Sequence, residues 1–151
     1  SQFRQLNKNK RGNYLIPLIS TSEVREISPS GKLINSFKVE GTPFTTLEST
    51  DGNYWIACGD GHTLIEVNPN DGQIIRRYNE NDIKGVRLFF TAGLCKSADG
   101  NLYICNWQGH SHDANAANSP QLFEINQKGE VIWSLNDNQT SGMISAVSTI
   151  N

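Results

Sequence analysis

Hydrophobic positions in this chain come in short runs that alternate with polar ones, and turn-forming residues separate the runs. Such alternation is typical of β-strands, in which successive side chains point to opposite faces. In the middle of the chain the pattern predicts four strands in succession, at about 44–50, 54–59, 63–68 and 74–79. We find no helical repeat in the sequence, apart from a single helical turn that it allows around 81–84. The pattern predicts an all-β fold.

One block of sequence occurs three times. Each copy opens on a turn and strand (GNYLI, GNYWI, GNLYI), continues with an acidic-aliphatic strand (EIS, EVN, EIN) and ends on a second turn and strand (GKLINSF, GQIIRRY, GEVIWSL). Glycine and asparagine suit such turns because they tolerate positive φ angles. Glu26, Glu66 and Glu124 recur at one position of the block. A position repeated in every unit is expected to be architectural rather than catalytic.

Four antiparallel strands that recur every 40–50 residues or so are the signature of β-propeller blades. We expect three four-stranded antiparallel blades at about 3–39, 44–79 and 89–136, and one extra inner strand at 142–150 that belongs to a fourth unit. Propellers close with about four to eight blades. The chain 1–151 is therefore expected to be a partial β-propeller domain, about half of a ring. The remaining blades would come from an upstream segment or from another copy of the chain.

The segment EINQKGEVIWSL and its two sister segments look like repeats of quinoprotein-type (PQQ-like) propellers, and SADGNLYI is similar to NHL-type repeats. The resemblance covers nearly the whole chain. It implies an extracytoplasmic protein, periplasmic or secreted, that binds ligands or serves as a scaffold, and it identifies no reaction. The signature tryptophan of the PQQ-type repeat matches only Trp133, because Asn35 and Arg76 stand at the equivalent positions. PQQ is therefore not expected as a cofactor.

Composition and charge exclude several classes of partner. The chain has 13 Lys and Arg against 15 Asp and Glu, for a net charge of −2, which gives no electrostatic case for nucleic acid or an anionic membrane. Its 151 residues suit one ordinary globular domain. No apolar run approaches the length of a transmembrane helix, so no membrane span is expected.

Three cysteines, Cys58, Cys95 and Cys105, fall in apolar strand-like runs. A free cysteine in such a run behaves as a small buried hydrophobe. A Cys95–Cys105 disulfide across the hairpin that turns at 99–100 stays open as an alternative, and the redox compartment stays open with it. A two-residue turn there would place Cys95 opposite Ile104 instead.

The lengths of the connections between strands indicate which end of the blades carries the binding face. If the strands of a blade are named a, b, c and d, the a–b and c–d turns lie at one end, and the b–c and d–a connections lie at the other. Every a–b and c–d turn is short, whereas the insertion 108–120 joins b to c in the third unit and 79–89 joins d to a before it. Binding residues concentrate on variable loops held by a rigid scaffold. We expect the binding face at the end that bears both insertions.

Four candidate ligand-binding residues lie on this face: Asp60, His62, Arg87 and Trp107. The Trp107 ring could stack on a sugar or another flat ligand, or it could seal the end of its blade. The Arg87 guanidinium could pair with an anionic ligand, or with the carboxylate of Glu80 or Asp82.

Three further residues form a candidate metal site in the loop WQGHSHDANAANSP, at 107–120. His110, His112 and Asp113 could present nitrogen and oxygen ligands to one divalent metal, because alternate residues of an extended chain point the same way. The alternative is a solvated polar loop that binds no metal.

We find no nucleophile elbow, phosphate-binding glycine loop or cysteine zinc pattern in the sequence. We therefore interpret the chain as a non-catalytic propeller module that binds a small molecule, a glycan or a protein partner, or acts as a scaffold. The alternative is the C-terminal half of a propeller enzyme: a quinoprotein oxidoreductase, a sulfotransferase-like enzyme or a metal-dependent hydrolase or lyase. In that case absent blades would complete the active site.

Overall fold

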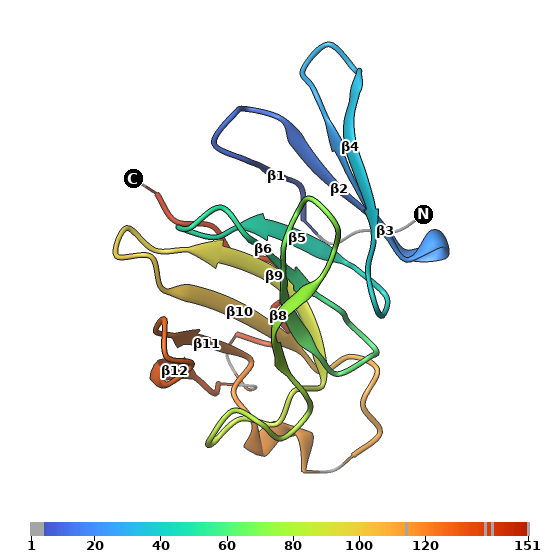
Figure 1. The fold of residues 1–151 in the computed structure, drawn as a ribbon. Helices are drawn as coiled ribbons and strands as arrows, with labels where there is room; N and C mark the ends of the chain where they lie inside the picture. Colours follow the sequence, from blue (N-terminus) through green and yellow to red (C-terminus); the bar gives the residue numbers. More distant parts are fainter. Residues whose placement is uncertain (1–4, 114, 138, 140, 151) are drawn as a thin grey trace.

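The structure is a computed structural model that describes residues 5–113, 115–137, 139 and 141–150. Within them the chain forms three four-stranded antiparallel sheets, arranged in chain order (Figure 1). The first sheet holds β1 (Asn7–Lys8), β2 (Tyr14–Leu18), β3 (Glu23–Ile27) and β4 (Leu33–Lys38). The second holds β5 (Thr45–Glu48), β6 (Tyr54–Ala57), β7 (Leu64–Val67) and β8 (Ile74–Tyr78). The third holds β9 (Phe90–Lys96), β10 (Leu102–Trp107), β11 (Leu122–Ile125) and β12 (Val131–Leu135).

These three sheets confirm the predicted fold class, an all-β partial propeller with four-stranded antiparallel blades. In each sheet the strands pair in sequence order, so β1, β5 and β9 are the a strands and β4, β8 and β12 the d strands. The a strands contact one another in chain order, β1 with β5 and β5 with β9. They are therefore the inner strands of the blades.

The hydrophobic core lies between neighbouring blades. Successive residues of a strand point to opposite faces, so the two faces of β6 pack on different neighbours. Tyr54 and Ile56 join the apolar cluster shared with the first blade, and Trp55 and Ala57 join the cluster shared with the third. Both faces of the strand are buried in this way, which accounts for the short hydrophobic runs in the sequence.

The hairpin between β9 and β10 has a three-residue loop rather than the two-residue turn considered from the sequence. The backbone N–H of Ser97 donates to the carbonyl of Asn101 at 3.0 Å, and the N–H of Gly100 donates to the carbonyl of Ser97 at 3.1 Å. Gly100 has a φ of 82°. A type I turn closed by a left-handed residue is a common hairpin loop, and glycine adopts that conformation without steric cost.

The extra loop residue shifts the pairing of the two strands by one position. Cys95 therefore lies opposite Tyr103, and the pairing with Ile104 is wrong. All three cysteines lie in the described part of the chain and are free, so no disulfide joins Cys95 to Cys105. Burial raises the pKa of the Cys58 thiol to about 11 and that of Cys105 to about 12. Both thiols are consequently protonated, and therefore unreactive, at neutral pH.

The helical turn that the sequence allows around 81–84 is not formed. The segment consists of turns and bends. Gly85 follows it with a φ of 81°, a left-handed conformation that stops a right-handed helix. The described residues contain two short 3₁₀ helices, η1 (Ile19–Thr21) and η2 (Ala116–Asn118), both in b–c connections. Neither has the length and apolar character that a bilayer-spanning helix requires.

The described segment 142–150 runs beside β9 (Figure 1) and forms no strand ladder there. A Cβ added to Gly93 would lie 2.7 Å from the Cα of Ala146. Further on, the Sγ of Cys95 lies 3.5 Å from the Oγ1 of Thr149. Gly93 thus lies beside Ala146, and Cys95, further along β9, lies beside Thr149, so the segment runs parallel to β9. An inner strand of the next blade would run in the same direction. No ladder partner for it is present among the three described sheets.

Candidate functional site

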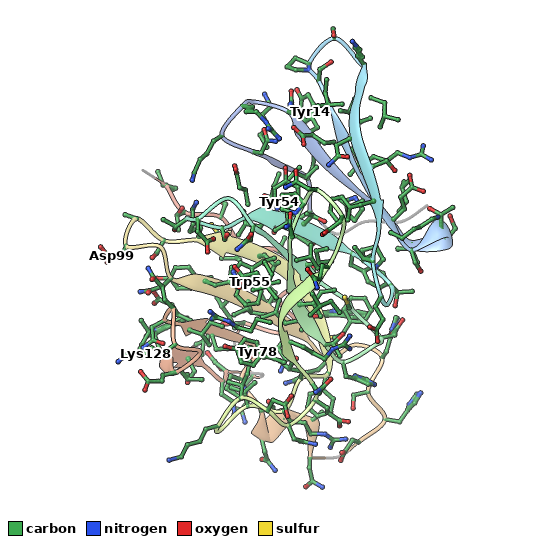
Figure 2. The ribbon with its side chains drawn as sticks, viewed as in Figure 1. Tyr14, Tyr54, Trp55, Tyr78, Asp99 and Lys128 are labelled. Atoms are coloured by element: carbon green, nitrogen blue, oxygen red, sulfur yellow. The ribbon has the colours of Figure 1, made fainter. Side chains whose placement is uncertain are left out.

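Both long connections open at the same end of the blades (Figure 1). Asp99 and Lys128 mark an a–b and a c–d turn of the third blade, and Figure 2 shows both at the opposite edge of the molecule. A cavity of about 310 Å³ lies at the end with the long connections. Its lining includes all seven residues predicted from the sequence: Asp60, His62, Arg87, Trp107, His110, His112 and Asp113. The structure thus brings together residues from three connections.

Asp60 and His62 are held by the tight loop between β6 and β7. Gly59 has a φ of 49°, and a Cβ there would lie 2.2 Å from the ring of Phe44, so glycine is required. His62 also has a positive φ, 53°. This conformation costs a non-glycine residue about 1–2 kcal/mol. The imidazole Nδ1 of His62 donates a hydrogen bond to the carbonyl of Phe89, which ties this loop to the 79–89 insertion.

His110 and Asp60 connect the b–c loops of adjacent blades. The Nδ1 of His110 lies 2.9 Å from the Oδ1 of Asp60. A carboxylate only accepts hydrogen bonds, so Nδ1 carries the proton in this pair and Nε2 is the ring nitrogen left to a ligand. The two side chains are 56% and 59% exposed. A ligand that enters the cavity can therefore reach both of them.

Aromatic rings form one wall of the cavity. The Trp107 ring centroid lies 5.2 Å from that of Phe90 and 4.6 Å from that of His110, in both cases edge to face. The Trp107 ring also covers Gly109, where a Cβ would lie 2.1 Å from it. Trp107 therefore seals the end of its blade and lines the cavity as well, so its two predicted roles are compatible.

Arg87 is engaged by two carboxylates. Its Nε lies 2.6 Å from the Oε1 of Glu80, and its Nη1 contacts the Oδ2 of Asp113. The hydrogen bonds that Arg87 donates, first to Glu80 and then to Asp113, raise the pKa of Arg87. The backbone N–H of Asn115 and the guanidinium of Arg87 lower the pKa of Asp113. Of the two carboxylates considered from the sequence, Glu80 is the one that pairs with Arg87.

Asn106 is a structural residue of the site that the sequence analysis did not single out. It is fully buried, and its Oδ1 accepts a hydrogen bond from the N–H of Phe89 at 2.7 Å. Its Nδ2 donates to the carbonyls of Arg87 at 2.8 Å and Pro120 at 3.0 Å. This amide therefore joins both insertions to the end of β10. A polar residue inside the apolar run 102–107 was the available signal.

The three candidate metal ligands do not form a metal centre in this structure. In the part of the chain that the structure describes, no three side chains of His, Cys, Asp or Glu are grouped to hold a metal ion. The reason is that the carboxylate of Asp113 contacts Arg87, while His110 is bound to Asp60. His112 lines the cavity as an exposed side chain.

The blades and their order define a β-propeller protein, and solved structures agree. The fold matches virginiamycin B lyase from Staphylococcus aureus at 13% identity, with a TM-score of 0.66, over 95% of this chain and 44% of that chain. It also matches the WD40 domain of Pan2 from Neurospora crassa at 13% identity, with a TM-score of 0.57, over 95% of this chain and 41% of that chain. WD40 domains are β-propellers. The resemblance to propellers is confirmed at the level of the fold.

The chain belongs to the Mal s 1 allergenic protein-like family, whose model matches residues 1–130. A protein of unknown function from Bacteroides caccae is 53% identical, and its crystal structure matches with a TM-score of 0.81 over 97% of this chain and 54% of that chain. The chain spans about half the length of these structural relatives. No curated protein matches the sequence.

Proposed function

We propose that the cavity at the end with the long connections binds a small polar ligand, neutral or positively charged, and that the chain is a ligand-binding part of a propeller. The distribution of charge carries this proposal. Three carboxylates line the cavity, those of Asp60, Glu80 and Asp113, and Arg87 is the one Lys or Arg among the lining residues. With neutral histidines, three negative charges and one positive charge leave an excess of two negative charges.

The electrostatics of Arg87 disfavour an anionic ligand. The positive charge of Arg87 is already compensated by the carboxylates of Glu80 and Asp113, so it attracts a third anion only weakly. An anion would also approach the carboxylate of Asp60, which is exposed beside His110. Hydroxyl or ammonium groups, by contrast, would donate hydrogen bonds to these oxygens.

Size and lining favour a ligand no larger than a monosaccharide. A volume of about 310 Å³ is at the small end of the roughly 300–1,000 Å³ found for ligand pockets. The rings of Phe89, Phe90 and Trp107 supply apolar surface beside the polar groups. A sugar offers both a polar edge and an apolar face, and such amphipathic contact is what tryptophan provides.

The experiment compares three sugars that share a ring and differ in charge: glucosamine, methyl glucoside and glucuronate. Binding to the complete protein would be followed by calorimetry, and by NMR shifts of the amides at 60–62 and 107–113. We expect glucosamine and methyl glucoside to bind and glucuronate to bind most weakly. Glucuronate as the tightest ligand, or shifts that avoid these loops, would overturn the proposal.

A catalytic role for His110 is the second candidate function. The carboxylate of Asp60 fixes Nδ1 of His110, an arrangement that orients an imidazole for acid–base chemistry at Nε2. One structural neighbour is named as a lyase, at 13% identity. Chemical conversion of a bound ligand by the protein, and its loss in a His110→Gln variant that still binds, would favour this candidate.

The remaining propeller blades are the partner that we infer for this chain. Three blades are fewer than a closed propeller contains, and the structural relatives are about twice as long. The mass of the purified natural protein, measured by light scattering, tests the inference. A particle with the mass of three blades alone would contradict it.

An extracytoplasmic location is part of the proposal, because the resemblance to quinoprotein-type propellers implies it. Fractionation of the cells that produce the protein would test it. Recovery with a cytoplasmic marker enzyme would contradict it.

A further inference from the structure

A glutamate on the c strand is paired with the turn asparagine in every blade. The side-chain amide of the asparagine donates to the glutamate in the pairs Asn13–Glu26, Asn53–Glu66 and Asn101–Glu124, at 2.6, 3.5 and 3.0 Å. The repeated pair explains why these glutamates recur, and the prediction of an architectural role fits Glu26 well. The surroundings of Glu66 differ.

Between the first and second blades the glutamate is fully satisfied. Glu26 is 1% exposed, and its carboxylate also accepts hydrogen bonds from Asn9 at 2.7 Å and from Arg11 at 2.9 Å. The phenol of Tyr54, on the second blade, donates to Oε2 at 3.2 Å. Its ring packs against Phe37 at a centroid distance of 6.2 Å. Figure 2 places Tyr54 between these two sheets. Donors and an aromatic ring thus close this junction.

Between the second and third blades the same positions are occupied differently. In the aligned repeats Leu102 stands where Tyr54 does, Asp51 stands where Arg11 does, and Ser49 replaces Asn9. The junction therefore lacks the phenol and the amide, and its cation, Arg76, stands on the d strand at the position of Asn35. Asp51 introduces an additional carboxylate.

The carboxylate of Glu66 is left buried with long contacts. It is 4% exposed, yet the nearest donors are the Nδ2 of Asn53 at 3.5 Å and the Nε of Arg76 at 3.7 Å. Burial, and then the charge of Asp51, raise the pKa of Glu66. A buried carboxylate with weak hydrogen bonds is unfavourable unless a further donor reaches it.

A cavity of about 260 Å³ lies beside this carboxylate, and Trp55, Leu102 and Ile125 form its apolar walls. An apolar cavity of roughly 150 Å³ already admits a benzene molecule. The Trp55 ring is stacked on that of Tyr78, 6.1 Å away, and both are marked in Figure 2. The cavity therefore has room for one substituted aromatic ring next to Glu66.

We propose that this inter-blade cavity is a second ligand site, which takes a small aromatic ring that carries an ammonium group. The ring replaces the Tyr54 ring of the preceding junction, and the ammonium supplies the close donor that Arg76, 3.7 Å from Glu66, does not. Glu66 and Asp51 carry two negative charges against the one positive charge of Arg76 in the lining, so the ammonium also neutralises the excess. Glu66 and Asp51 accept its hydrogen bonds. The site opens at the short-turn end of the blades, so it is separate from the cavity with His110 and does not depend on the function proposed for that cavity.

Benzylamine, benzyl alcohol and toluene are the probes, because they share a ring and differ in the donor and its charge. Dissociation constants for the complete protein would come from NMR titration, with the amides of Gly100 and Gln127 as reporters. A hydrogen bond to a charged group predicts that benzylamine binds about tenfold or more tightly than toluene. Equal affinities, or no shift at these amides with benzylamine, would overturn the proposal.

Two substitutions of Leu102 separate occupancy from folding. Leu102→Tyr copies the first junction and is expected to abolish benzylamine binding and to raise the melting temperature. Leu102→Phe fills the same space without a donor, so it should also abolish binding but leave Glu66 unsatisfied and the protein less stable than Leu102→Tyr. Glu66→Gln keeps the shape and should weaken benzylamine about tenfold while toluene is unaffected. Benzylamine binding unchanged in all three variants would contradict the assigned site.

Discussion

The imidazole of His110 and the carboxylate of Asp60 meet at 2.9 Å although 50 residues separate them in the sequence. One side chain belongs to the 108–120 insertion of the third blade and the other to the short b–c loop of the second. Their contact joins two blades at the mouth of the candidate ligand cavity. It therefore gives a direct way to change the cavity while the sheets remain intact.

Asp60→Asn should weaken ligand binding without unfolding the protein. The substitution removes one of the negative charges that favour a neutral or cationic ligand and loosens the orientation of His110. Because both partners are more than half exposed, the expected loss of stability is below about 1 kcal/mol. Glucosamine titration and thermal unfolding measure the two effects. Asp99→Asn, at an exposed turn at the opposite end, is the matched control. Equal affinity in both variants would remove Asp60 from the site.

Arg87→Gln should loosen the contact between the insertions 79–89 and 108–120. Without the guanidinium, Glu80 and Asp113 lose their shared partner, and the pKa of Asp113 should rise towards its ordinary value because one of the groups that lower it is gone. Faster amide hydrogen exchange at 80–89 and 111–113 is the expected readout. Arg25→Gln, which removes an ion pair with Glu23 on the first blade, serves as the control. Unchanged exchange at both segments would show that the ion pairs do not order the loops.

The blades were predictable from the sequence because two local signals agree. Alternation with a period of two marks each strand, and the glycine turns repeat at matching positions of the three blocks. Connection lengths alone then placed the insertions at one end. This is why Asp60, His62, Arg87 and the residues of the 107–113 stretch, which are far apart in the chain, could be assigned to one surface.

The contacts within that surface were not predictable, because they depend on side-chain reach across blades. Glu80 and Asp82 are equally plausible partners for Arg87 in the sequence, whereas in the structure Asp82 accepts hydrogen bonds from Asn79 and Glu80 pairs with Arg87. The register at Cys95 was wrong for a similar reason, since the sequence around Gly100 permits a loop of two or three residues. The opening beside Glu66 was not predictable either, because it depends on how the side chains of Trp55 and Leu102 pack between the second and third blades.

Asn106→Ala should destabilise the protein strongly. The buried amide makes hydrogen bonds with three backbone groups. Its removal takes their partner from the N–H of Phe89 and the carbonyl of Pro120, whereas the carbonyl of Arg87 keeps the hydrogen bond from the Ser119 hydroxyl at 2.8 Å. Each unsatisfied buried group costs about 1–3 kcal/mol, so the two groups together should cost about 2 kcal/mol or more. For a chain of this size, a loss of about 2 kcal/mol corresponds to a fall in melting temperature of roughly 4–8 °C. Asn70→Ala, in an exposed turn, should change stability by less than about 0.5 kcal/mol. Similar melting temperatures for the two variants would refute the anchoring role of Asn106.

Glu23 on the first blade should make folding sensitive to acid. Hydrogen bonds from Arg25 at 2.6 Å, Ser36 at 2.5 Å and Lys38 at 3.3 Å lower its pKa to about 2. An unfolded glutamate has a pKa of about 4.3. Because the folded value is the lower one, the stabilisation is fully present above the unfolded pKa and is lost as the pH falls from about 4.3 to about 2.

Urea denaturation of the natural protein and of Glu23→Gln at a series of pH values tests this dependence. The difference in the free energy of unfolding between the two proteins should be largest near neutral pH and should shrink as the pH falls through that window. Glu130→Gln, in a c–d turn where Asn126 donates to Glu130 at 2.7 Å, controls for the loss of any carboxylate from the surface. A difference in the free energy of unfolding that stays constant from pH 7 to pH 2 would mean that the contacts of Glu23 stabilise its protonated and ionised forms equally. The low pKa assigned to this carboxyl group would then be wrong.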